Sequence, residues 1–506
     1  MKGMKTYEKI LLLFFFILIF AVAIPVLADE SGVEVRYNIK VKEDYFDVKA
    51  ELTGVSQNEV IIAFEELLDC VEDLKFYNKD DKALDVSILD KGVYKINLAG
   101  SENINLYYNY RPDEVEHDYH YPTLTSSYLH IPGESFFIRL YDRESQIGDY
   151  SDSLVKNFRL KIEELPAEWD LLTTYPVDEE GYILINTYES LLSAGDYDRY
   201  TFSIGVSKVI IAVDSENKIS FENYIDEIED IFENYYNIFA KVPGNQNIIV
   251  LNQSRKEFNE YSSSLGGQAK KDNVIIEIGG INDNNIDRHK ASVLSHIGHE
   301  VMHLWVPWGF NIADDWSWLW EGVAEYKSYQ VLQDLSLISN DEFEKALLER
   351  RLKNYYRNEL KDSIDLIAVS TAQEGQPGYS SMLYDKGTLL IYLLDQELHK
   401  KGRDINDFLS ELYQEYGVTN KPLGNGQLVS FINAYLGNNT FTEKYVTGTA
   451  PISKYSIGLW FRYQNIVLWS YLGTPPFPYP WDLIVVLFIL IFVFTLIWLI
   501  VKKVRD

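Results

Sequence analysis

The chain has 506 residues and a formal charge of −30, with 46 basic against 76 acidic side chains. This length is enough for two or three domains with cores of their own. The charge excludes nucleic-acid binding, because phosphate recognition requires basic patches, and we interpret it as solubility of an exposed surface. The single cysteine, Cys70, excludes an internal disulfide.

The amino-terminal segment is typical of a secretory signal. Three lysines among the first nine residues precede an apolar run over residues 10–27, and Ala28 closes a small-x-small cleavage pattern. We therefore predict a signal peptide over residues 1–28, with an uncleaved anchor as the alternative, because the run is long for a signal. Either way the bulk of the chain is exported, and export without disulfides favours a prokaryotic cell surface.

The next region, residues 29–204, has the pattern of β structure. Short runs in which apolar and polar residues alternate, such as Val33 to Ile39, are separated by turn residues. We predict an N-terminal β domain, a sandwich, with a structural or substrate-guiding role. His117 and His120 form an H-x-x-H pair in a charged stretch, for which a solvated loop is favoured over a second metal site.

Residues 205–452 are predicted to form an α+β domain. Its first half alternates strand and helix patterns and gives a small mixed sheet, whose edge could accept an extended peptide. The strands are expected at 206–214, 247–251 and 273–278, and the helices at 221–239, 290–305, 340–356, 383–400, 405–416 and 426–435.

The helix over 290–305 contains the motif H-E-x-x-H. His299 and His303 are four residues apart, so both imidazoles lie on one helix face and can bind one metal ion. Glu300 projects beside them, where it can take a proton from a metal-bound water. The motif thus supplies two metal ligands and a base, which is not yet a complete zinc site.

A catalytic zinc requires a third protein ligand and one open position. Glu321 follows His303 after seventeen residues, a gap that fits a turn and a second helix folding back on the first. Glu325 lies one helical turn beyond Glu321. It could accept a hydrogen bond from a ligand imidazole and fix its tautomer, or it could be a solvated carboxylate on the helix surface.

Three segments together resemble the gluzincin metallopeptidases. They are H-E-V-M-H-L-W at 299–305, W-L-W-E-G-V-A-E-Y at 318–326 and Y-D-K-G at 384–387. The resemblance is closest to the glycyl aminopeptidase family and more distant to the alanyl aminopeptidase family. It implies a thermolysin-like zinc peptidase domain that acts on peptides, in which Tyr384 stabilises the oxyanion of the tetrahedral intermediate.

The resemblance also implies an upstream Gly-rich edge strand whose glutamate holds the free amine of the substrate. The segment that fits best is Gly266-Gly267-Gln268-Ala269-Lys270, and Ala269 stands in the place of the acid. Both aminopeptidase and endopeptidase activity are therefore left open.

The carboxyl-terminal segment has the composition of a membrane anchor. Residues 483–501 form an apolar run long enough to cross a bilayer, and the basic tail 502–506 places the C-terminus in the cytoplasm. A linker over 453–482 ends in an aromatic cluster typical of a membrane interface. The sequence thus predicts a single-pass protein of the cell membrane with its ectodomain outside.

The sequence as a whole favours a membrane-anchored extracellular zinc metallopeptidase. In this hypothesis His299, His303 and Glu321 bind one zinc ion, Glu300 is the general base and Tyr384 the oxyanion stabiliser. The alternative is a catalytically inactive, zinc-stabilised surface protein that binds peptides or a partner. A third interpretation, an adhesive or solute-binding protein in which H-E-x-x-H is coincidental, is weaker, since every residue that the chemistry needs is present.

Overall fold

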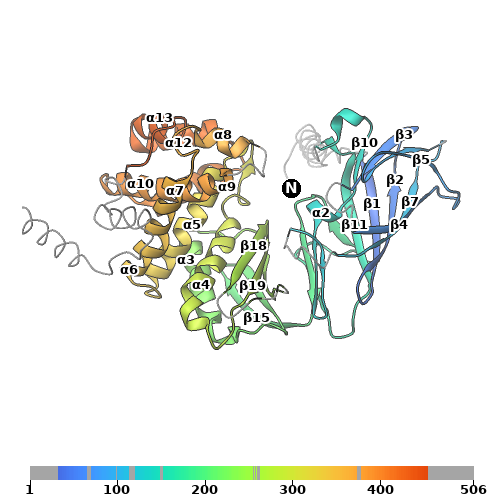
Figure 1. Cartoon of the computed structure of the whole chain (residues 1–506), viewed down its shortest axis with the longest axis horizontal. Coiled ribbons are helices and arrows are strands. Elements are labelled where there is room, and N and C mark those ends of the chain that lie inside the picture. Colours follow the sequence, from blue (N-terminus) through green and yellow to red (C-terminus); the bar gives the residue numbers. More distant parts are fainter. Residues whose placement is uncertain are drawn as a thin grey trace, which may run out of the picture.

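The structure is a computed structural model that describes residues 32–453, apart from 65–69, 99, 113–119, 149–151, 255, 257, 259–261 and 373–377. The predicted signal peptide, the predicted membrane segment with its tail, nearly all of the linker and His117 lie outside the described residues. Within the described part, none of the helices is long and apolar enough to span a bilayer. The described residues form a β-rich N-terminal domain and a mixed domain beside it (Figure 1).

The N-terminal domain consists almost entirely of strands. Its elements are β1 (Val33–Val41), β2 (Phe46–Thr53), β3 (Glu59–Ala63), β4 (Val71–Tyr77), β5 (Asp85–Asp90), β6 (Val93–Asn97), β7 (Ile104–Tyr110), β8 (Thr123–Leu124), β9 (Tyr128–Pro132), α2 (Gly133–Phe136), β10 (Arg139–Tyr141), β11 (Val155–Glu164), β12 (Asp170–Leu172), β13 (Ile183–Ile185) and β14 (Leu191–Gly195). They form sheets in the orders β13-β11-β1-β2-β7-β4, β10-β3-β6-β5 and β12-β14-β9-β8.

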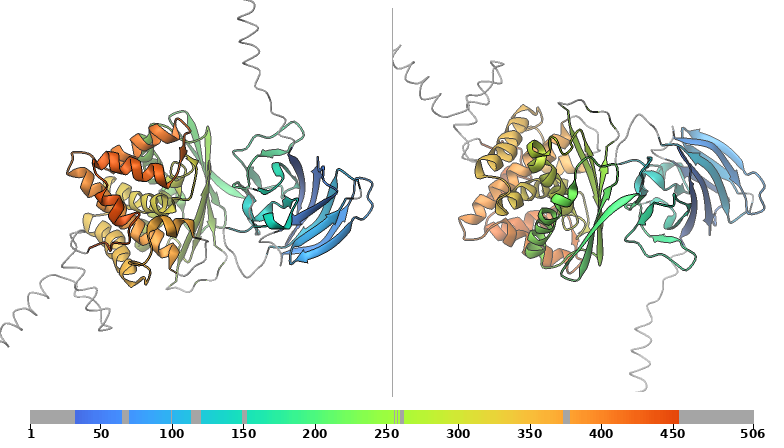
Figure 2. Two further views of the ribbon diagram at one scale, coloured as in Figure 1. Left: turned by 90° about the horizontal axis from the view of Figure 1, so that it is seen from above. Right: turned by 90° about the horizontal axis from the view of Figure 1, so that it is seen from below.

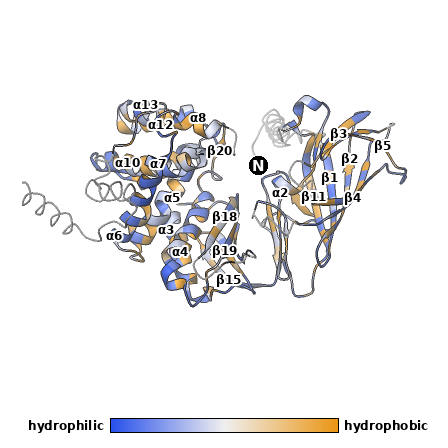
Figure 3. Cartoon of the chain, viewed as in Figure 1, coloured by the Kyte–Doolittle hydropathy of each residue, from blue (hydrophilic) through white to orange (hydrophobic). Residues whose placement is uncertain are grey.

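Alternating side chains explain why these segments fold as sheets around one core. Every second residue along β1 and β2 is buried, which the two-residue period of a strand with one covered face requires, and Figure 3 shows the mixed hydropathy of these strands. The buried apolar residues of all three sheets join in one cluster. The predicted β domain is therefore present.

The boundary of this domain differs from the predicted one. The strand β15 (Tyr197–Ile204) pairs with β16 (Ser207–Asp214) and is the edge strand of the second domain's sheet. The sequence pattern had placed the boundary after residue 204. An alternating strand indicates only that one face is covered, so its pattern does not reveal which sheet it joins, and the described boundary falls before Tyr197.

The second domain is built on a five-stranded sheet in the order β15-β16-β17-β19-β18. β16 and β19 (Asn273–Gly279) are parallel to β17 (Gln246–Gln253) between them, whereas β15 and β18 (Ser264–Lys270) run antiparallel at the edges. The sheet is thus small and mixed, as predicted, and β18 forms one of its edges.

Both faces of this sheet are covered. One face packs on the helices in the largest apolar cluster. The other forms a smaller cluster with residues of the N-terminal domain, among them Tyr128 and Leu191. Burial on both faces explains the continuous apolar runs of the parallel strands, and Figure 2 shows the sheet between the helices and the N-terminal domain.

The predicted helices are present in the predicted order, and three short helices, Leu366–Thr371, Tyr379–Ser381 and Thr440–Tyr445, were not predicted. The helices of this domain are α3 (Ile225–Phe239), α4 (Ile286–His303), α5 (Ser317–Asp334), α6 (Asn340–Phe343), α7 (Arg350–Arg357), α8 (Leu366–Thr371), α9 (Tyr379–Ser381), α10 (Gly387–His399), α11 (Ile405–Leu412), α12 (Asn425–Leu436) and α13 (Thr440–Tyr445), together with the short strands β20 (Asn311–Ile312) and β21 (Pro422–Leu423). Wider π-type turns continue α6 into α7, precede α10 over Met382–Lys386 and follow α11.

Candidate active site

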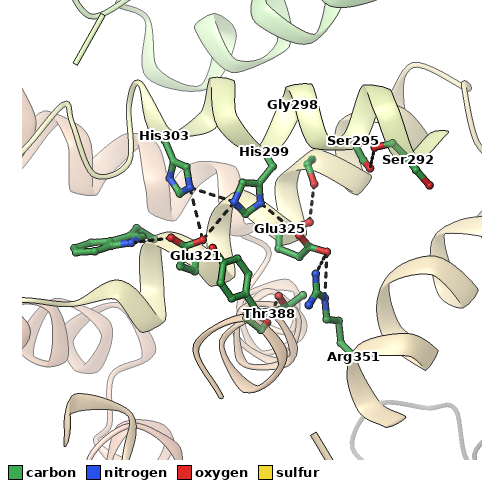
Figure 4. A network of polar contacts seen from close by, with 12 residues as sticks. Ser292, Ser295, Gly298, His299, His303, Glu321, Glu325, Arg351 and Thr388 are labelled. Atoms are coloured by element: carbon green, nitrogen blue, oxygen red, sulfur yellow. Dashed lines mark hydrogen bonds and ion pairs between the residues drawn. The ribbon is translucent and has the colours of Figure 1, made fainter. Parts of the chain in front are cut away.

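Two neighbouring helices bring the predicted metal ligands together. α4 presents His299 and His303 one turn apart, and α5, packed against it, presents Glu321. The Nε2 atoms of the two histidines are 3.2 Å apart, and Oε2 of Glu321 lies 3.3 Å from Nε2 of His299 and 3.6 Å from Nε2 of His303. Figure 4 shows the three side chains converging on one point.

This triangle has the size that a zinc ion needs. In a tetrahedral site with metal–ligand bonds of about 2.0–2.1 Å, neighbouring ligand atoms lie about 3.3 Å apart. In addition, Oε2 of Glu321 is buried and has no hydrogen-bond partner. A buried carboxylate oxygen without a partner is costly in a protein interior, and a cation at the centre of the triangle would satisfy it. The residues present therefore fit zinc.

In both imidazoles, Nδ1 lies near an oxygen atom, and Nε2 faces the metal position. Nδ1 of His303 donates to the carbonyl oxygen of Val306 at 2.9 Å, and Nδ1 of His299 lies 3.4 Å from Oε2 of Glu325. An acceptor at Nδ1 places the proton there and leaves the lone pair of Nε2 for the metal. Glu325 thus contacts a predicted ligand and is not a solvated surface carboxylate.

Trp320, which the sequence reasoning did not single out, orients the carboxylate ligand. Its indole Nε1 donates to Oε1 of Glu321 at 3.2 Å, leaving Oε2 for the metal position. Burial alone would raise the pKa of Glu321, but the imidazoles of His303 and His299 outweigh it and lower the pKa well below its usual range.

Glu300 lies between α4 and the edge strand β18. It is 5% exposed, and a Cβ at Gly267 would lie 2.7 Å from its Cγ and 2.9 Å from its Oε1. The glycine in β18 therefore makes room for the carboxylate of Glu300. This contact places the predicted base directly beside the edge strand.

Tyr384 reaches the site from the π-type turn that precedes α10. Its ring centroid is 6.0 Å from that of His299, with the planes 22° apart. The approach depends on two glycines, because a Cβ at Gly322 of α5 would lie 2.7 Å from the carbonyl carbon of Gly387. The close backbone contact between α5 and α10 thus places Tyr384 near the predicted metal ligands.

One protein family matches the part of the chain that contains this site. Residues 277–443 match the peptidase family M1 domain. The chain carries a peptidase family M1 domain. The match covers all the predicted site residues, and it confirms the expected gluzincin metallopeptidase with its zinc ion. The finer preference for the glycyl aminopeptidase family stays a prediction.

One solved structure supports the fold, and a second is more distantly similar. An aminopeptidase N family protein from Idiomarina loihiensis is 14% identical with a TM-score of 0.68, over 84% of this chain and 78% of that chain. An M1 zinc metallopeptidase from Deinococcus radiodurans is 12% identical with a TM-score of 0.49, over 83% of this chain and 96% of that chain. No match was found among the curated proteins.

The M1 domain contains a network of ion pairs, largely buried, that the sequence motifs did not predict. The guanidinium of Arg351, on α7, contacts Oε1 of Glu325 through Nε at 3.1 Å and also through Nη2. Its Nη1 donates to Oδ1 of Asp385 at 3.1 Å. Burial disfavours the charged form of Glu325, but His299 and Arg351 outweigh it and lower its pKa to about 2.

Arg351 therefore connects the metal-binding helices with the turn that carries Tyr384. Through Glu325 it supports the ligand His299, and through Asp385 it holds the turn that carries Tyr384, whose ring centroid is 5.9 Å from the guanidinium carbon. Figure 4 shows the contacts that run from His299 through Glu325 to Arg351. An arginine far from the motif in sequence gives no signal of its own, because basic residues on amphipathic helices are usually solvated.

Proposed function

We propose that the chain is a zinc peptidase that cleaves peptides laid along the edge strand β18, with zinc held by His299, His303 and Glu321. The observation that carries this proposal is the meeting of three ligand atoms, spaced for one ion, with a carboxylate at an open strand edge. When bound, zinc polarises the scissile carbonyl and acidifies a water.

The protein groups around the zinc position have complementary roles. Glu300 accepts a proton from the attacking water on its carboxylate and later passes it to the leaving amine. The hydroxyl of Tyr384 donates a hydrogen bond to the oxygen on which charge develops, as the resemblance implies. The open edge of β18 offers N–H and C=O groups that hold the peptide extended.

Metal removal and restoration test the proposal. We expect residues 29–474 to hydrolyse peptides in a mixture, to lose this activity when a chelator removes the metal, and to regain it with one equivalent of zinc. Mass spectrometry of the products and metal analysis of the protein measure both. Bound zinc without hydrolysis of any peptide would favour the inactive surface binding protein instead.

We also propose that the enzyme is anchored in the cell membrane by the apolar run 483–501, with the domains outside. The support is the sequence alone: a nineteen-residue run that is apolar except for Thr495, followed by a basic tail. Full-length protein should sediment with membranes and be accessible to protease from outside intact cells, whereas a chain ending at 474 should be released. Full-length protein that stays soluble after washing would contradict the anchor.

Arg351→Gln should damage both the metal site and the fold. It leaves Glu325 and Asp385 buried without their cation, which costs about 3–5 kcal/mol of stability. Loss of support behind a metal-ligating histidine typically costs about 10–100-fold in metal affinity or activity. Chelator competition and thermal unfolding measure the two effects.

The matched control is Arg350→Gln, because Arg350 is the neighbouring residue and its side chain is exposed. It should leave the zinc affinity and the unfolding temperature unchanged. Arg351→Lys keeps the charge but not the forked geometry, and we expect it to recover part of the stability and less of the zinc affinity. Wild-type zinc affinity in Arg351→Gln would remove Arg351 from the support of the site.

A further inference from the structure

The register of β18 fixes which of its backbone groups point toward the outer edge of the sheet. Lys270 and Asn273 are paired across a two-residue turn, so their backbone groups face each other. Because the direction alternates along a strand, Leu265, Gly267 and Ala269 point their N–H and C=O groups away from β19. A peptide that adds to this edge must pair with these three residues.

At Ala269, the last of these three residues, the carbonyl oxygen already accepts a hydrogen bond. Nε1 of Trp308, in the segment after α4, donates to the carbonyl oxygen of Ala269 at 2.6 Å. The ammonium of Lys270 lies 5.1 Å from the centroid of the Trp308 ring and is ion-paired with Glu134 of the N-terminal domain at 2.8 Å. Trp308 is therefore held against β18 by two contacts, and Lys270 links this arrangement to the N-terminal domain.

From these contacts we infer that Trp308, backed by the Lys270–Glu134 ion pair, ends the peptide-binding edge at Ala269 and limits the substrate to one or two residues on the N-terminal side of the cleaved bond. This inference rests on the proposed function. Glu300 contacts Gly267, so cleavage takes place opposite that residue. Two residues of extended chain, about 6.8 Å, separate Gly267 from the blocked position.

The direction of the substrate follows from the same edge. A peptide that pairs antiparallel with β18, the slightly more stable arrangement, directs its N-terminus toward Ala269 and Trp308 and its C-terminus toward Leu265. The blocked side is then the N-terminal side, which agrees with an aminopeptidase-like M1 domain. The restriction is steric, and it acts although Ala269 stands where the resemblance expects an acid.

Product patterns of folded variants test this inference. The zinc-loaded wild-type chain should release only one- or two-residue fragments from a linear ten-residue peptide and should leave a cyclic peptide of the same composition intact. For each protein, the rate of cleavage at the third and later bonds is divided by the rate at the first bond. This ratio should be at least tenfold higher in Trp308→Ala and in the milder Trp308→Leu than in wild type. The cyclic peptide should become a substrate of both variants.

The exposed neighbour Lys271 supplies the control, since Lys271→Ala should keep the wild-type product pattern. Glu134→Gln, which weakens the ion pair behind Trp308, should shift the pattern in the direction of Trp308→Ala. Cleavage of the cyclic peptide by the wild-type chain would overturn the inference. An unchanged pattern of peptide products from folded, active Trp308→Ala and Trp308→Leu would overturn it as well. A zinc-loaded wild type that cleaves no peptide at all would instead overturn the proposed function.

Discussion

Glu300→Gln is expected to lower kcat by about 10²–10⁴-fold, the usual contribution of a general base, while zinc stays bound. The amide has nearly the shape of the carboxylate, so it fits the space that Gly267 leaves beside α4. It cannot accept the proton of the attacking water. Because Glu300 is outside the cluster of ligand atoms, the metal content should not change.

Single-turnover hydrolysis of a peptide and metal analysis of the same sample measure the two effects of Glu300→Gln together. The control is Glu359→Gln, which makes the same chemical change at an exposed position and should leave both quantities unaltered. Near-normal turnover in Glu300→Gln would mean that another group is the base. Loss of zinc would mean that the residue supports the metal instead.

The sequence predicted the ligand cluster because its geometry is local. A four-residue spacing on α4 fixes the relation of His299 to His303, and the short distance along the chain to Glu321 leaves little freedom for the second helix. The parallel strands of the sheet were equally visible, since burial on both faces makes their sequences continuously apolar. In both cases neighbouring residues carry the information.

Contacts between distant segments could not be predicted in the same way. Arg351 belongs to the site only because α7 packs beside the turn of Asp385, and Trp308 belongs to the edge of β18 only because the chain folds back after α4. β15 was assigned to the wrong domain for the same reason. A side chain's partner across the fold leaves no periodicity in the sequence.

The two glycines that join α5 and α10 are an intermediate case. Gly322 follows the ligand Glu321 and Gly387 ends the Y-D-K-G segment, so both were part of the motifs that carried the resemblance. The sequence alone gave no reason for them. The structure supplies one, because a Cβ at either position would lie 2.6–2.7 Å from the backbone of the other helix. These glycines set how near Tyr384 comes to the metal ligands.

The position of Tyr384 beside the metal ligands leads to the second prediction, a large loss of kcat. Tyr384→Phe should lower kcat by about 10²–10³-fold, the usual cost of losing one donor to the oxyanion. KM and the zinc content should stay close to wild type. The phenyl ring keeps the packing against His299 and Arg351, so only the hydroxyl is lost. A donor that acts on charge developing in the transition state changes kcat without changing ground-state binding.

Tyr392→Phe, about two turns further along the same helical run, is the matched control and should keep wild-type kcat. Steady-state kinetics on one peptide, with unfolding temperatures of all three proteins, separates catalysis from stability. Unchanged peptide cleavage in Tyr384→Phe would remove its hydroxyl from the mechanism. A rise in KM at constant kcat would show that the hydroxyl binds the substrate rather than the transition state. Either result would restrict the role of the Gly322–Gly387 contact to packing, because the tyrosine that it positions would not act on the oxyanion.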